Sequence, residues 1–61
     1  MYRIVAIKLH PANDREMEFV SETVRDLSLA QEFYKIILDC LVFYDVRLEY
    51  RVGQTWFSME V

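Results

Sequence analysis

A strict alternation of apolar and charged residues near the C-terminus constrains the fold most. From 45 to 52 the apolar positions are Val46, Leu48, Tyr50 and Val52, and every position between them is charged. A period of two predicts a strand with one buried face. Gly53-Gln54 follows as a two-residue turn in which glycine supplies the positive φ, and residues 55–61 return as the partner strand.

The length of this turn sets the register of the hairpin. On one face we expect Tyr50 opposite Phe57, Leu48 opposite Met59 and Val46 opposite Val61; on the other we expect Arg51 opposite Trp56, Glu49 opposite Ser58 and Arg47 opposite Glu60. Both sets are compatible cross-strand pairs.

Residues 27–41 have the periodicity of an amphipathic helix. Ser28, Gln31, Glu32, Lys35 and Asp39 form one narrow polar stripe, and apolar residues fill an opposite arc of about 160°. Asp26 or Ser28 caps the start of the helix. Cys40 falls on the apolar arc and is expected to be buried.

The pattern in the first 25 residues predicts secondary structure less clearly. Residues 2–9 predict a strand with Val5, Ile7 and Leu9 toward the core. For residues 14–25 two interpretations stay open: a helix capped by Asn13, or a strand that a turn at 11–14 joins to the first one. We favour the strand, which gives an α+β fold of type ββαββ: a four-stranded antiparallel sheet with one helix on one face. With residues 14–25 helical, the order becomes β-α-α-β-β or β-α-β-β.

With 61 residues the chain is expected to form a single domain (1–61) with a small core. Its only cysteine, Cys40, has no partner for an internal disulfide, and Cys40 with His10 cannot complete a four-ligand zinc site. We therefore expect no metal and no cofactor, and stabilisation by apolar packing together with homodimerisation.

Charge and composition argue against several functions. Seven Lys and Arg against ten Asp and Glu give a net charge of −3, which argues against nucleic acid as a partner. No constellation of residues indicates an enzyme. The apolar runs are too short to span a membrane, and one unpaired cysteine suits a reducing compartment, so we expect a cytoplasmic protein.

Three groups of residues are candidates for interaction. Tyr2 and Ile4 would form an apolar patch on the outer face of the sheet, and Glu16, Glu18 and Glu22 an acidic one that suits a basic protein surface. Arg47, Arg51 and Trp56 would share the outer face, either as a solvent-facing cation–π group or as a binding hot spot.

These features predict a small non-enzymatic protein-binding or regulatory module, homodimeric, that occupies a partner's surface in the manner of an acidic phage or prophage inhibitor. The alternative is single-stranded nucleic-acid binding through Arg47, Arg51 and Trp56.

Overall fold

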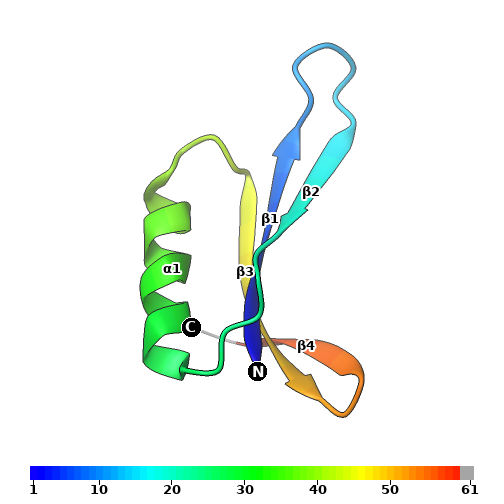
Figure 1. Cartoon of the computed structure of the whole chain (residues 1–61). Helices are drawn as coiled ribbons and strands as arrows, with labels where there is room; N and C mark the ends of the chain where they lie inside the picture. Colours follow the sequence, from blue (N-terminus) through cyan, green and yellow to red (C-terminus); the bar gives the residue numbers. More distant parts are fainter. Residues whose placement is uncertain (60–61) are drawn as a thin grey trace.

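The computed structural model describes residues 1–59 and confirms the ββαββ arrangement. Its elements are β1 (Tyr2–Leu9), β2 (Glu16–Val20), α1 (Leu27–Asp39), β3 (Asp45–Val52) and β4 (Thr55–Met59). The strands form one antiparallel sheet in the order β2-β1-β3-β4, and α1 lies along one face of it (Figure 1). We call that face the helix-side face and the other the open face.

The β3–β4 hairpin has the predicted register. Tyr50 pairs with Phe57, Leu48 with Met59, Arg51 with Trp56 and Glu49 with Ser58. Gly53 has φ 62°, the left-handed conformation that glycine adopts without steric cost. The expected pairs of Val46 with Val61 and of Arg47 with Glu60 lie outside the described residues.

Helix α1 starts where predicted and ends two residues early. The side chain of Asp26 accepts a hydrogen bond from the Ser28 N–H at 2.9 Å, so Asp26 is the N-cap. At the other end Cys40 is extended, with φ −79° and ψ 99°, and its N–H donates to the Ile37 carbonyl. The helix predicted at about 27–41 is confirmed; the apolar pattern continues past its last residue, Asp39, and Leu41 is 95% exposed.

A turn after β1 excludes the helical alternatives for residues 14–25. The His10 N–H donates to the Arg15 carbonyl at 2.8 Å, and Asp14 takes a positive φ of 55° between them. The Asn13 side chain accepts the Arg15 N–H at 3.1 Å. Asn13 thus caps this turn instead of a helix, and the chain enters β2 antiparallel to β1.

Strand β2 occupies only part of residues 14–25, the segment for which a strand was favoured from the sequence. After Val20 the Ser21 hydroxyl takes the place of a main-chain acceptor and receives the Ile4 N–H at 2.8 Å. Only Val24 returns to β1, in an isolated bridge to Tyr2 with hydrogen bonds of 2.7 and 2.8 Å. The chain then leaves the sheet plane and starts α1.

The core lies between α1 and the two central strands. Ile4, Ala30 and Leu48 are its fully buried residues. Partly buried residues pack around them: Tyr2, Val24, Leu27, Tyr34, Ile37, Val46 and Met59.

The predicted core face of β1 is wrong. Pairing of β1 with β3 sets Ile4 opposite Leu48 and Ala6 opposite Val46, so the even-numbered residues of β1 face the helix and Val5 and Ile7 face away. Because β1 is apolar on both faces, its own pattern does not identify the buried one.

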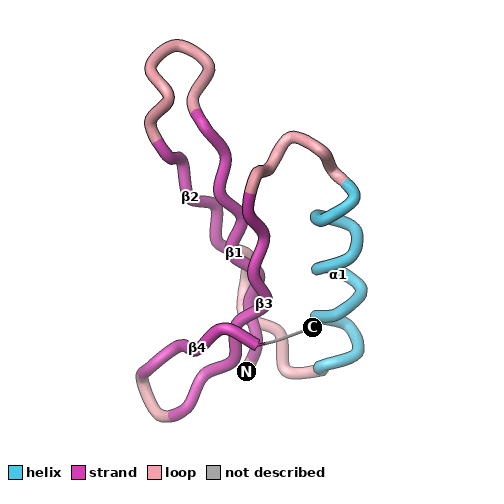
Figure 2. Tube along the Cα trace, turned by 180° about the vertical axis from the view of Figure 1, so that it is seen from behind, coloured by secondary structure: helices cyan, strands magenta, loops and turns pink. Residues whose placement is uncertain are grey.

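Within the described residues, α1 packs on β1 and β3 and on neither edge strand. Figure 2 shows the consequence: β2 and β4 diverge on either side of the region that the helix covers. On the helix-side face, Phe19 of β2 and Phe57 of β4 are therefore largely uncovered, whereas Met59 at the end of β4 packs against the core.

Candidate interaction surfaces

Two of the predicted interaction residues belong to the core. Ile4 is 1% exposed and forms the buried cluster with Leu48 and Ala30, and Tyr2 packs against the same cluster while pairing with Tyr50. The apolar patch that we expected from Tyr2 and Ile4 on the outer face does not exist. The register of β1 against β3 overturns that prediction.

The open face carries a small buried layer of its own. Val5 is 2% exposed although no helix lies over it. Its cross-strand neighbours are Arg47 on β3 and Val20 on β2. Long side chains such as arginine cover apolar neighbours with their aliphatic stems, which accounts for this burial.

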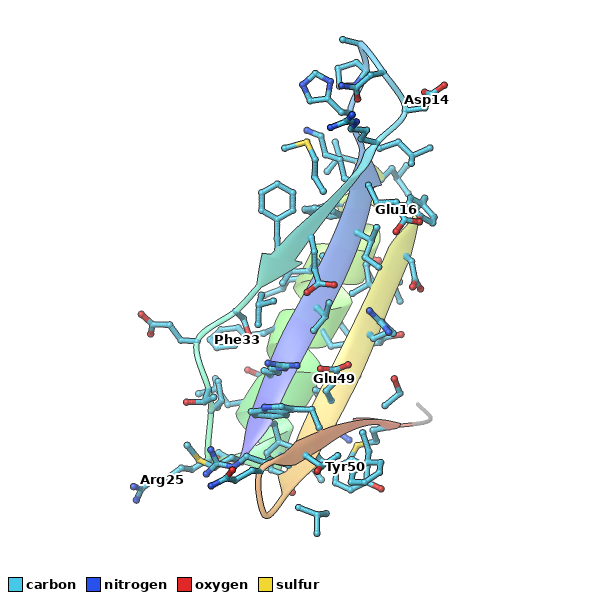
Figure 3. The ribbon with its side chains drawn as sticks, turned by 90° about the vertical axis from the view of Figure 1, so that its right-hand side faces the viewer. Asp14, Glu16, Arg25, Phe33, Glu49 and Tyr50 are labelled. Atoms are coloured by element: carbon cyan, nitrogen blue, oxygen red, sulfur yellow. The ribbon has the colours of Figure 1, made fainter. Side chains whose placement is uncertain are left out.

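Arg3 contacts both β3 and β4 on the open face, and this role was not predicted from the sequence. Its Nε donates to Glu49 Oε1 at 2.8 Å, and its guanidinium lies 4.2 Å from the centroid of the Trp56 ring. Arg51 approaches the same ring at 5.8 Å. Glu49 is buried at the centre of this group, in front of the sheet in Figure 3.

The role of Arg3 was not predicted from the sequence because it depends on strand order. Only the adjacency of β1 and β3 places it opposite Glu49. Nothing in the local pattern of residues 2–9 indicates which strand lies beside them.

The predicted trio of Arg47, Arg51 and Trp56 is brought together only in part. Arg51 pairs with Trp56, as expected. Arg47 lies nearer the other end of β3, where its Nε is 3.8 Å from Asp45 Oδ2 and buried without a hydrogen-bond partner. The open face therefore holds a stacked Arg3–Trp56–Arg51 group, with Arg47 apart from it.

The predicted acidic residues are all exposed. Glu16 and Glu18 lie on β2, and Glu22 lies in the segment that follows. The Tyr44 hydroxyl donates to the Glu16 carboxylate. This hydrogen bond, with the negative charges of Glu16 and Asp45, raises the pKa of Tyr44 above its usual 10.0, because ionisation would break the bond and set a phenolate beside carboxylates.

A second feature that sequence reasoning missed is an exposed apolar area between α1 and β2. Leu29, Phe33 and Ile36 follow one flank of the helix and are exposed. In Figure 3 Phe33 lies on the side of β1 where β2 runs. Phe19 of β2 is 45% exposed and meets the half-buried Phe43 edge-on, with ring centroids 5.9 Å apart. We call these five residues the α1–β2 surface.

The width of the apolar arc was the available signal for this surface. An arc of about 160° exceeds the roughly 100° that a helix needs to cover a core. Part of the apolar arc was therefore expected to stay exposed, although the sequence did not show which flank of the helix this would be.

His10 and Cys40 have local structural roles. His10 Nδ1 accepts the Ala12 N–H at 3.1 Å inside the turn. Cys40 is an exposed free thiol at the helix end, so the prediction that it is buried is wrong. Residues 1–59 contain no pocket and no group of three or more potential metal ligands.

Comparison of the chain with protein-family models, with curated proteins and with solved structures finds no match. Among the residues that the structure describes, no helix is long and apolar enough to cross a membrane.

Proposed function

We propose that this chain is a non-enzymatic protein-interaction module that forms a homodimer and acts by occupying a surface of a partner protein. The observation that supports it best is the incomplete cover of the sheet. Phe19 on β2 and Phe57 on β4 are each 45% exposed, beside strand edges whose outer main-chain groups have no partner strand within residues 1–59. Apolar side chains next to an open edge favour association with another chain.

The edge that suits a second copy is β4. Its residues Thr55–Met59 include no charge. Antiparallel self-pairing centred on Phe57 sets Phe57 opposite its own copy and joins the two sheets without placing like charges together. Natural edges that avoid such pairing carry lysine or proline, and β4 has neither.

The test is the mass in solution, measured by sedimentation equilibrium at micromolar concentration. Wild type is expected to be a dimer and Phe57→Lys a monomer, because two lysines would face each other at the centre of the interface. Val52→Lys is the matched control: it adds the same charge to an exposed apolar position of the same hairpin, but on β3. A monomeric wild type, or equal masses of the two variants, would contradict dimerisation through β4.

The partner is expected to present a basic surface. Between 14 and 32 the chain has six acidic residues, Asp14, Glu16, Glu18, Glu22, Asp26 and Glu32, against Arg15 and Arg25. Binding to such a surface is expected to weaken as salt increases.

Nucleic-acid binding through Arg47, Arg51 and Trp56 stays the alternative prediction. The geometry favours it less, because Arg3 already lies over the Trp56 ring and Glu49 balances the charge of Arg3. Titration of the single tryptophan with a single-stranded oligonucleotide tests it: fluorescence quenching that weakens with salt supports binding, and an unchanged spectrum excludes it.

A further inference from the structure

We propose that the outer edge of β2, together with the α1–β2 surface, binds an extended segment of a partner protein in which basic and apolar residues alternate, and that this segment adds to the sheet as a fifth strand. The inference rests on the proposed protein-binding function and names the partner's chemistry.

The first support is the open edge of β2. It is the outermost strand beside β1, and four of its five residues are exposed. An edge strand presents main-chain N–H and C=O groups that an incoming strand satisfies, which supplies affinity independent of sequence. Five residues match a segment of about 16 Å.

The second support is the apolar area on one side of this edge. Phe19 lies opposite Ala6 on the helix-side face, which α1 leaves uncovered above β2. Phe43 meets the Phe19 ring edge-on, and Phe33 is exposed on α1, on the side of β1 where β2 runs (Figure 3). Every second side chain of an added strand would point to this face and contact the α1–β2 surface.

The third support is charge on the other side of the same edge. Glu16 and Glu18 alternate with Met17 and Phe19, so the carboxylates lie on the open face. Residues of the added strand that point to this face are next to carboxylates, and lysine or arginine complements them.

The charges around this edge are mixed near the turn and mainly acidic beyond β2, where the exposed Arg25 adds one positive charge. Near the turn, Lys8 of β1 pairs with Met17 of β2, and Arg15 directly precedes β2. Away from the turn, Glu22 follows β2, and Glu32 neighbours Leu29 and Ile36 on the helix surface. We therefore place the centre of the basic contact at Glu18.

The same charges disfavour a second copy at this edge. Antiparallel self-pairing of β2 about its centre sets Glu18 opposite Glu18. Like charges directly opposite each other destabilise a strand pair. The two edges of the sheet thus differ: β4 is uncharged and compatible with itself, whereas β2 requires a basic strand.

The experiment uses a synthetic peptide in which lysine and valine alternate and a control peptide with the same residues in two blocks. Each is titrated into the full-length chain while main-chain amide shifts and hydrogen exchange are followed by NMR. We expect the alternating peptide to slow exchange of the β2 amides and to shift the signals of Phe19 and Phe33. The block peptide cannot present basic and apolar faces at once and is expected to bind about tenfold more weakly or worse.

A pair of variants tests the charge argument. Glu18→Lys is expected to lower the affinity for the alternating peptide about three- to tenfold, because it replaces a cross-strand attraction with a repulsion. It should also accept a peptide in which glutamate replaces lysine. Asp39→Lys makes the same charge change at an exposed position at the end of α1, outside the acidic run of residues 14–32, and is expected to leave the peptide affinity within about twofold. Equal losses of peptide affinity in the two variants would mean that only the net charge of the protein matters, and would overturn the proposal.

The remaining outcomes separate this inference from the proposed function. Protection of β4 amides instead of β2 amides would overturn the edge assignment but leave protein binding in place. A basic peptide that forms an amphipathic helix is titrated in the same way; if only this peptide binds, at the α1–β2 surface, strand addition is overturned and the function likewise stays in place. If none of these peptides binds, the inference is overturned, and the masses of wild type, Phe57→Lys and Val52→Lys then decide the dimer separately.

Discussion

The guanidinium of Arg3 lies 4.2 Å from the centroid of the Trp56 ring, although these residues belong to strands that are not neighbours. β3 runs between them, and its Glu49 receives the Arg3 Nε. One arginine therefore ties β1, β3 and β4 together on the face that has no helix.

Arg3→Ala is expected to lower the free energy of unfolding by about 1–3 kcal/mol, because it leaves the buried Glu49 carboxylate without its cation. Urea unfolding provides the measurement. Arg25→Ala removes an exposed arginine and should change stability by about 0.5 kcal/mol or less. Similar losses for the two variants would mean that the Arg3–Glu49–Trp56 group contributes little.

The face assignment of β1 is tested by Ile4→Ala against Leu9→Ala. Ile4 is in the core, so its truncation is expected to cost about 2–5 kcal/mol, comparable with the whole stability of a domain of this size. Leu9 is exposed, and its truncation should have a much smaller effect. If Ile4→Ala does not fold, Ile4→Val, with an expected cost of about 0.5–1.5 kcal/mol, keeps the comparison measurable. A larger loss at Leu9 would contradict the observed register.

The Tyr44–Glu16 hydrogen bond predicts a dependence of stability on alkaline pH. The folded-state pKa of Tyr44 is raised, so the folded state holds the phenolic proton more tightly than the unfolded state. The resulting stabilisation is fully present below pH 10.0, the unfolded value, and is lost as the pH rises through the folded pKa.

Ultraviolet titration of wild type minus Tyr44→Phe isolates this tyrosine. Glu16→Gln removes the negative charge and is expected to move the pKa of Tyr44 back toward 10.0. Glu18→Gln, on the same strand, is the control. An unchanged Tyr44 titration in Glu16→Gln would contradict the assigned cause.

Gly53→Ala is expected to destabilise the β3–β4 hairpin by about 1–2 kcal/mol. The cost comes from a φ of 62° alone, because a Cβ at this position would meet no atom within 4 Å. Asparagine tolerates the left-handed region, so Gly53→Asn should lose less stability than Gly53→Ala. Thermal unfolding of the two variants measures the difference, and equal losses would point to a cause other than backbone conformation.

Local patterns predicted the elements that depend on neighbouring residues. The β3–β4 register followed from the strict alternation of residues 45–52 and from one glycine, and the start of α1 followed from Asp26. The turn at 10–15 required knowledge of the Asp14 conformation, so helix and strand stayed open for residues 14–25.

The candidate surfaces were less accessible to sequence reasoning. Glu16, Glu18 and Glu22 are exposed as expected, whereas Tyr2 and Ile4 are in the core and Cys40 is exposed. The sequence signal for Phe33 of the α1–β2 surface was limited to the width of the apolar arc, because a helical wheel shows how wide such an arc is and not which part of it a sheet will cover.

The sequence alone determined that this chain has one amphipathic helix and one tightly registered hairpin, since both depend on periodicity and turn chemistry within a few residues. Tertiary structure decided which face of β1 is buried. It also decided that Arg3 meets Glu49 and Trp56, and that one edge strand is acidic and the other uncharged. These features depend on strand order, and strand order follows from packing between segments that are distant in the sequence.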